Sequence, residues 1–141
     1  MTGTIALKVE GIADLQEKFA LLKAGTQKAV LRRALREAGE VVRAEAERLA
    51  PYDNASEGPH LKDNIIARVR ITGEVQEATV GFDKKVYHGQ FQELGTDRHA
   101  PQPFLRPALD TKQGEAIERI ADVLMEQVDK AVRRKRSRKD G

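Results

Sequence analysis

The sequence contains no cysteine and no tryptophan, and only 4% of its residues are aromatic. Without cysteine the chain has no disulfide, no thiol nucleophile and no zinc or iron–sulfur site built on cysteine ligands. With so few aromatic residues, the hydrophobic core must be mainly aliphatic. A long apolar run is also missing, and the first ten residues lack the apolar core of a signal peptide. We therefore expect a protein that stays in the cytoplasm after synthesis and has no membrane partner.

Charge is abundant but unevenly distributed. Charged residues make up 33% of the 141 residues, and the formal net charge is +3. The last nine residues contribute +5 of this, which leaves −2 for residues 1–132. Like charges repel and nothing in this stretch can be buried, so it should be frayed or disordered. The length and charge pattern predict one domain over residues 1–132 and a flexible basic tail over residues 133–141.

Hydrophobic periodicity predicts an α+β fold. Apolar and polar residues alternate, as in half-buried strands, in residues 4–10, 61–71 and 75–82. Apolar residues recur at helical spacing in residues 12–22, 27–50 and 117–132. Gly73 lies between the second and third strands and favours a hairpin there. We expect a small antiparallel sheet, with the long helix of the N-terminal half and the C-terminal helix packed on it.

The helix at residues 27–50 is the longest periodic segment, about 36 Å at 1.5 Å per residue. Thr26 is the expected N-cap, and Pro51 should end the helix. Residues 51–60 are rich in turn-forming residues and predict an exposed loop. In the C-terminal helix, the apolar stripe is expected to include Ile117 and Ile120.

Residues 86–110 differ in composition from the rest of the chain. They hold three of the five prolines, two of the four phenylalanines and two of the three histidines. The first part, residues 86–94, predicts a short helix in which Tyr87, Phe91 and Leu94 form one apolar face. Gly95 follows and is expected to end this helix, because glycine tolerates positive φ.

The second part of this segment should cross the molecule in an extended conformation. Pro101 and Pro103 disfavour helical geometry in the residues before them. Phe104 and Leu105 are expected to insert into the core. Pro107 then suits the first turn of the next helix, because its φ is already fixed near a helical value.

Two motifs in this segment carry a family resemblance. The pattern Y-x-x-x-F-x-E-x-G-T begins at Tyr87, and A-P-Q-P-F-L-R-P-A-L begins at residue 100. Together they resemble the signature of head–tail joining or tail-completion proteins, minor tail components of long-tailed bacteriophages and prophages. The likeness continues weakly through G-I-x-x-L at Gly11 and around Pro51. His88 and Leu94 depart from the family pattern. The residues that form the expected structural or assembly motif are Tyr87, Phe91, Glu93, Gly95, Thr96, Pro101, Pro103, Phe104, Leu105, Arg106 and Pro107.

The resemblance implies a structural protein of the virion. In the family, copies of the protein form a ring at the neck, where the tail tube meets the head, and six copies is the expected number. The implied partners are further copies of the chain, other neck and tail-tube proteins, and DNA that passes through the lumen without sequence recognition. The implied location is the host cytoplasm during assembly and then the virion. The loop at residues 51–60 would face the lumen or a neighbouring ring.

Catalysis and metal binding find little support. His60, His88 and His99 lack the spacing of metal ligands, and no cofactor motif is present. Glu93 could be paired with His99 or Asp97 as an acid and a base, but no nucleophile motif accompanies them. We expect that the protein is not an enzyme and binds no cofactor. Glu93 should instead accept hydrogen bonds from a backbone terminus or pair with an arginine.

The basic tail supports a second hypothesis, a small nucleic-acid-binding accessory protein. Lysine and arginine on phosphates release counterions and give weak, salt-dependent binding. A solvated terminus without a partner explains the composition equally well. The candidate contacts are Arg133, Arg134, Lys135, Arg136, Arg138 and Lys139. A third hypothesis treats residues 101–107 as a proline-rich peptide ligand, but burial of Phe104 and Leu105 explains that segment better.

Overall fold

The computed structural model describes residues 2–8, 19–20, 22–51, 58–73, 75–86, 88–98 and 100–140. Its strands are β1 (Thr2–Lys8), β2 (Ile65–Thr72) and β3 (Val75–Phe82). Its helices are α2 (Ala24–Leu49), α3 (Gly89–Leu94) and α4 (Leu105–Asp140), with short 3-10 helices η1 (Leu61–Asn64) and η2 (Lys84–Val86). The predicted helix at residues 12–22 and most of the predicted loop at residues 51–60 lie outside the described residues.

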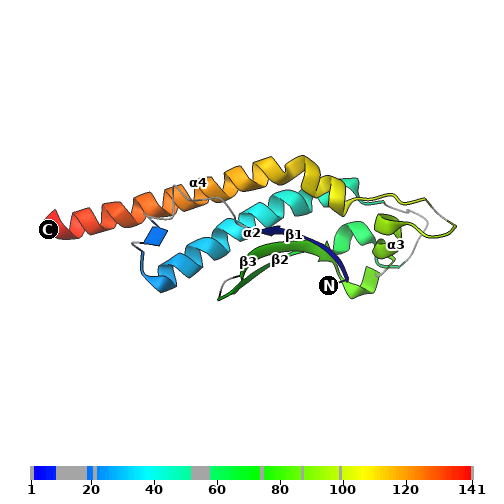
Figure 1. Cartoon of the computed structure of the whole chain (residues 1–141), viewed down its shortest axis with the longest axis horizontal. Coiled ribbons are helices and arrows are strands. Elements are labelled where there is room, and N and C mark those ends of the chain that lie inside the picture. Colours follow the sequence, from blue (N-terminus) through cyan, green and yellow to red (C-terminus); the bar gives the residue numbers. More distant parts are fainter. Residues whose placement is uncertain are drawn as a thin grey trace.

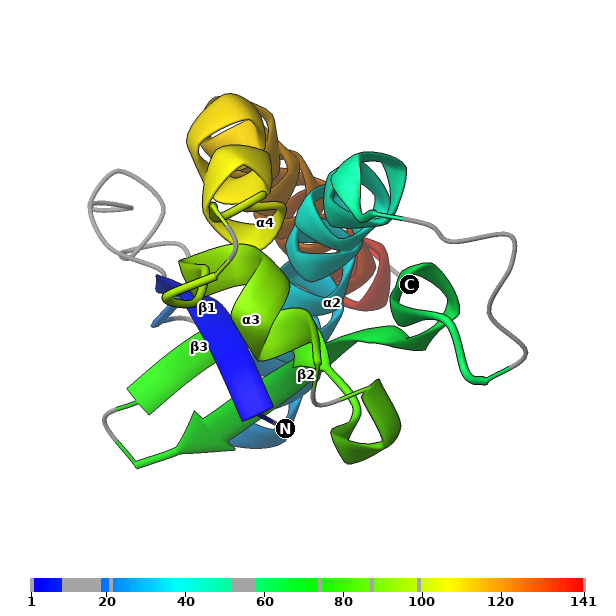
Figure 2. The same cartoon turned by 90° about the vertical axis from the view of Figure 1, so that its right-hand side faces the viewer.

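The elements form three layers. Figure 1 shows α4 lying along α2, with the sheet on the other side of α2. Seen from the end of the molecule in Figure 2, α2 occupies the middle of the stack, and α3 lies near one end of the sheet. The predicted α+β fold, with a small antiparallel sheet packed against two long helices, is confirmed.

The sheet has the order β1-β3-β2, and both pairs are antiparallel. β2 and β3 are joined through Gly73, whose φ of 42° suits a tight hairpin turn. β3 has the predicted bounds, whereas β1 begins two residues earlier than predicted, and the start of the second predicted strand forms η1. Alternation in β3 places Ala78, Val80 and Phe82 in the core.

α2 packs closely on the sheet because small residues face it. A Cβ built on Gly39 would lie 3.5 Å from the Cβ atoms of Ala67 and Ala78, which is ordinary van der Waals contact. The predicted N-cap is wrong, since the helix begins at Ala24 and Thr26 lies in its first turn. The helix start has no side-chain cap, but the Gln27 side-chain amide donates hydrogen bonds to the carbonyl oxygens of Phe19 and Leu22, at 3.0 and 2.9 Å, and so ties α2 to the residues before it.

α4 packs along α2 through residues that include Ala116, Ile120, Val123, Leu124 and Val128, all of them buried. The expectation that Ile117 lies in this stripe is wrong, because its side chain is 46% exposed. Ile120, which was predicted for the same stripe, is buried, so the predicted face differs from the observed one at Ile117. Glu37 on α2 and Arg119 on α4 form an ion pair across the two helices at 3.0 Å.

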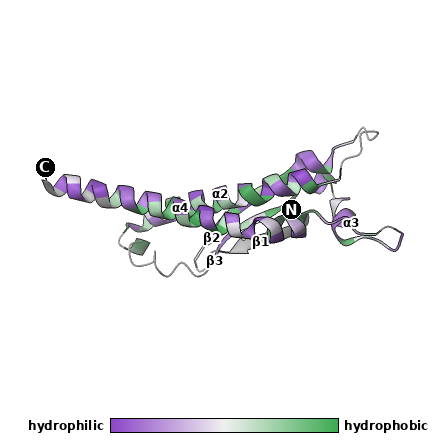
Figure 3. Cartoon of the chain, turned by 90° about the horizontal axis from the view of Figure 1, so that it is seen from above, coloured by the Kyte–Doolittle hydropathy of each residue, from purple (hydrophilic) through white to green (hydrophobic). Residues whose placement is uncertain are grey.

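The C-terminal tail differs from the prediction. Residues expected to be frayed continue α4 as far as Asp140. Extending an existing helix adds one backbone hydrogen bond per residue and avoids the cost of nucleation, and arginine and lysine are good helix formers. Figure 3 shows that this end of α4 is coloured mainly hydrophilic, whereas green residues gather where α2 and α4 meet.

Candidate functional site: the α3–α4 arm

Residues 89–106, here called the arm, run from α3 to the first turn of α4. Two short structures precede the arm and set its position. The Asp83 carboxylate accepts a hydrogen bond from the Lys85 N–H at 3.0 Å, and the Asp83 carbonyl accepts one from Val86 N–H at 3.0 Å. The predicted helix at residues 86–94 is therefore divided into η2 and the shorter α3.

α3 approaches the core through Gly89. A Cβ at this position would lie 2.6 Å from Leu61 Cδ1, so that the leucine side chain would have to move, and 3.2 Å from the Phe82 ring, which is a tight contact. The close approach of α3 to the core therefore favours glycine here. The sequence analysis did not single out this residue, and the only available signal was a glycine in the first turn of a short helix.

The close approach of Gly89 decides which side of α3 faces solvent. At 100° per residue, Gln92 and Glu93 share the inner side of the helix with Gly89. Phe91 and Leu94 then point outward, and they are 49% and 71% exposed. The predicted apolar face of this helix, as far as Phe91 and Leu94 form it, thus faces solvent. Tyr87, the third predicted member of that face, lies outside the described residues.

Gly95 ends α3, as predicted. Its N–H donates to the Phe91 carbonyl at 2.8 Å, and its backbone has φ 76° and ψ 175°. This region is accessible almost only to glycine. The chain then turns away from the helix axis, and the Thr96 hydroxyl accepts a hydrogen bond from the Arg98 N–H at 3.3 Å.

The segment that follows α3 returns alongside it. The Gln102 N–H donates to the Gln92 carbonyl at 2.7 Å, which fixes this part of the arm against the helix. Pro101 and Pro103 are exposed on either side of this bond. Residues 97 and 98 form a bend, and residues 100–103 form neither helix nor strand, so the extended conformation stays a prediction. His99 is not among the described residues.

Glu93 links α3 to the start of α4. Its carboxylate accepts hydrogen bonds from the backbone N–H groups of Phe104 at 2.7 Å, Leu105 at 2.9 Å and Arg106 at 2.9 Å. The first hydrogen bond within α4 runs from the Ala108 N–H to the Phe104 carbonyl, so the first four backbone nitrogens belong to residues 104–107. Three of them donate to Glu93, and the fourth, in Pro107, has no hydrogen.

The prediction that Glu93 satisfies a backbone terminus is therefore confirmed. A carboxylate at a helix N-terminus also interacts favourably with the helix dipole. Both oxygens of Glu93 accept these bonds, so the carboxylate has a structural role at the start of α4. Among the described residues, no group of three or more histidine, aspartate or glutamate side chains could hold a metal ion.

Phe104 and Leu105 enter the core directly after residues 100–103, as predicted. Both are almost fully buried, and the Phe104 ring lies against Phe82 with centroids 6.1 Å apart and planes tilted by 41°. The arm is thus held at three places: at Gly89, at Gln102 and at the Glu93–Phe104 link. This leaves Phe91 and Leu94 exposed on a fixed support.

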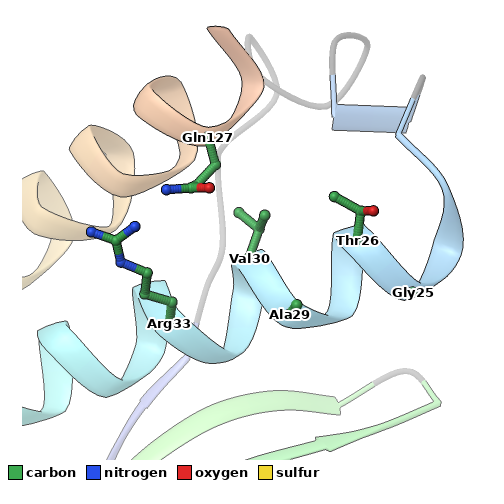
Figure 4. Close-up of a pocket in the computed structure, with 6 residues that line it drawn as sticks. All are labelled: Gly25, Thr26, Ala29, Val30, Arg33 and Gln127. Carbon is green, nitrogen blue, oxygen red and sulfur yellow. The ribbon is translucent and has the colours of Figure 1, made fainter. Parts of the chain in front are cut away.

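An open pocket of about 390 Å³ lies far from the arm, between the start of α2 and α4. Figure 4 shows Val30 and Gln127 directed toward each other across it. Its lining residues are Gly25, Thr26, Ala29, Val30, Arg33 and Gln127. Most of these groups are small or apolar, and the lining contains no histidine, aspartate or glutamate that could act as a general base.

The structure places the basic residues of the chain end on the last turns of α4. Arg133, Arg134, Arg136 and Arg138 are exposed there, about 40 to 48 Å from the end of the arm by the length of the helix. The side chains of Lys135 and Lys139 are not described. Within the described part of the chain, no helix combines the length and the apolar character needed to cross a membrane.

The fold and the arm define a class of protein: a small α+β protein that offers a supported surface in place of a reaction centre. The family comparison agrees with this class. A family model described as "Bacteriophage HK97-gp10, putative tail-component" matches residues 13–95, more than half of the chain. The chain belongs to this family of phage structural tail components and is not an enzyme.

The matched region ends at Gly95. It contains α2, the β2–β3 hairpin and α3, whereas the proline-containing part of the arm and all of α4 follow it. Neither the curated proteins nor the solved structures compared with the chain gave a match.

Proposed function

We propose that this tail component forms a homo-oligomeric ring at the phage neck, where it joins or terminates the tail tube at the head–tail interface. Six copies is the expected number. Neighbouring neck and tail-tube proteins would contact the faces of the ring, and DNA would pass through its lumen. Family membership supports the role in the tail, and the arm supports the assembly role.

The observation that carries the assembly role is the exposure of Phe91 and Leu94 on a clamped α3. Single exposed apolar residues are common on protein surfaces, but these two are neighbours on one helix turn. Their support is fixed by the three hydrogen bonds of Glu93. A rigid apolar surface loses little conformational entropy when it binds, which favours association.

The position of α3 also suits a ring. A closed ring needs head-to-tail contacts that join two different surfaces of the subunit. Figure 1 shows α3 at one end of the long axis, whereas α4 reaches the other end. A contact made through α3 therefore leaves the faces of α2 and α4 and the outer face of the sheet available for a second, different surface.

The test is the molar mass of the purified full chain, measured by light scattering over a range of concentrations with and without tail-tube protein. We expect a closed oligomer, visible as rings in negative stain. Replacing both residues, Phe91→Ser with Leu94→Ser, should shift the mass to that of the monomer. A matched control, Ile117→Ser with Met125→Ser, removes two similarly exposed apolar side chains from α4 and should leave the mass unchanged.

Two results would contradict the proposal. The first is a chain that stays monomeric at high concentration in the presence of tail-tube protein. The second is an oligomer whose molar mass is unchanged by substitution of Phe91 and Leu94 but falls to that of the monomer in the α4 control. That result would place the subunit contact on α4.

A further inference from the structure

The C-terminal part of α4 extends beyond the body of the protein. Gln127 lies across from Gly25 and Thr26, at the very start of α2, so α2 provides no packing surface for the turns of α4 beyond that point. Val128 is buried and Ala131 is half-buried, whereas the described side chains from residue 133 to residue 138 are all exposed. Figure 1 shows this end of the helix projecting alone, past α2 and the sheet.

The projecting part carries positive charge that the described residues do not neutralise. Three arginines on α2 have carboxylate partners: Arg33 pairs with Glu37, Arg43 donates to Glu40 and Glu47, and Arg48 pairs with Glu45. No ion pair joins a described carboxylate to the projecting arginines, which are Arg133, Arg134, Arg136 and Arg138. Lys135 and Lys139 add two further positive charges to the sequence of this segment.

These charges surround the helix. Successive residues are rotated by 100°, so Arg133, Arg134 and Arg136 point in three different directions. A helix that docks on another protein would present one face with an apolar centre. The described side chains of residues 133–138 are four arginines and one serine, with no apolar side chain among them. A positive rod of this kind fits a partner that surrounds it with negative charge.

We propose that residues 133–139 of α4 bind duplex DNA by lying in its major groove and contacting phosphates on both walls. The major groove is about 12 Å wide, and a helix with its side chains is about 10–12 Å across. Both walls of the groove carry phosphates, which matches a helix with cations on all sides. Phosphate contacts carry no sequence information, so the affinity is the same for different sequences.

This binding site lies outside the assembly surface and goes beyond the ring role. It also assigns residues 133–141 a function separate from residues 1–132. A monomeric chain could bind DNA in this way, and a ring could form without it. The outcome of the DNA experiment is therefore independent of the outcome of the molar-mass experiment.

The test measures binding of the full chain to a fluorescent duplex of about two helical turns by anisotropy, from low to physiological salt. The variant replaces four exposed arginines: Arg133→Gln, Arg134→Gln, Arg136→Gln and Arg138→Gln. The matched control removes the same charge from exposed positions on the body: Arg32→Gln, Arg36→Gln, Arg68→Gln and Arg98→Gln. A charge-preserving variant changes the four tail arginines to lysine.

We expect the glutamine variant to bind at least about tenfold more weakly at low salt and to reduce the slope of log K against log salt by about three to four. The body control and the lysine variant should bind the duplex with nearly the same affinity as the unmodified chain. A second duplex of unrelated sequence should bind with the same affinity. Circular dichroism of each variant shows whether the helices are retained.

The proposal is overturned if the full chain does not bind the duplex at low salt, or if the glutamine variant binds as tightly as the full chain. An equal loss of affinity in the body control would show that binding depends on the net charge of the chain and not on the position of the arginines on α4. A strong preference for one of the two duplexes would contradict phosphate-based binding. Binding to vesicles containing phosphatidylserine, without binding to the duplex, would assign the segment to a membrane surface.

Discussion

The Oε2 atom of Glu93 accepts a hydrogen bond from the Phe104 backbone N–H at 2.7 Å. This bond joins the inner side of α3 to the point where the chain enters the core and α4 begins. The same carboxylate accepts the next two N–H groups, so one side chain satisfies every free donor at the helix start. The exposed face of α3 is thereby fixed relative to the long helices.

We expect Glu93→Gln to destabilise the protein by about 1–3 kcal/mol, because hydrogen bonds to a charged acceptor and a helix cap are lost together. The amide can accept only through its oxygen, and it loses the favourable interaction with the helix dipole. Urea unfolding followed by circular dichroism measures the change. Glu118→Gln, at an exposed position on α4, is the control and should change the free energy of unfolding by less than about 0.5 kcal/mol.

Hydrogen exchange gives a local check on the same variant. The amides of residues 104–106 should exchange faster in Glu93→Gln than in the unmodified chain, while those in β3 keep their relative protection. Unchanged protection at residues 104–106, together with unchanged stability, would show that Glu93 does not hold the arm in solution.

Phe104→Ala should cost about 3–5 kcal/mol, because the ring is fully buried against Phe82 and its removal leaves a cavity. Leu94→Ala is the matched comparison within the same arm. Leu94 is 71% exposed, so its substitution should change the stability of the monomer by less than about 0.5 kcal/mol. Thermal and urea unfolding at low protein concentration measure both. Similar losses of stability in Phe104→Ala and Leu94→Ala would contradict the burial of Phe104.

Two glycine substitutions should have opposite effects. Gly89→Ala places a methyl group 2.6 Å from Leu61 Cδ1 and should cost about 1–3 kcal/mol through overpacking. At Gly114, within α4, a Cβ meets nothing within 4 Å, so Gly114→Ala should stabilise the helix by about 0.5–1 kcal/mol. Melting temperatures of the two variants measure the effects, and a stabilising Gly89→Ala would show that α3 does not pack as described.

The cluster around Arg43 should make stability depend weakly on pH. The hydrogen bond from Arg43 lowers the pKa of Glu40 below its ordinary value of 4.5. A lowered pKa in the folded state means that the stabilisation is complete above the unfolded-state pKa. It is then lost as the pH falls through the lower folded-state value. Because the Glu40 side chain is 57% exposed, solvent screening limits the effect to less than about 1 kcal/mol.

Glu40→Gln should therefore be less stable than the unmodified chain near neutral pH, and the difference should vanish at a pH well below 4.5. Urea unfolding at the two pH values measures this. If the difference in the free energy of unfolding between Glu40→Gln and the unmodified chain grows as the pH falls, the pKa of Glu40 is not lowered in the folded state.

Local patterns predicted much of the fold. The alternation of residues 75–82 predicted the bounds of β3, and the helical spacing of apolar residues over residues 27–50 located α2. The prolines at 101, 103 and 107 predicted an extended crossing and a helix start, because each acts on its own backbone and that of its neighbour. Burial of Phe104 and Leu105 followed from the same pattern.

Predictions failed where a distant contact decides the outcome. The stripe containing Phe91 and Leu94 was correct in spacing, but spacing cannot say which side of a helix meets the core. Gly89 decides this through Leu61 and Phe82, which are 28 and 7 positions away in the chain. The tail was predicted as frayed from its charge, whereas the nucleated α4 continues through it.

The sequence by itself therefore determined the class of fold, the presence and order of the described strands and long helices and the unusual character of the arm, since these depend on periodicity and on proline and glycine geometry. Only the tertiary structure decided what faces solvent on α3, which donors Glu93 accepts and how far α4 projects beyond α2. These features depend on contacts between residues far apart in the chain, and such contacts leave no periodic signal in the sequence.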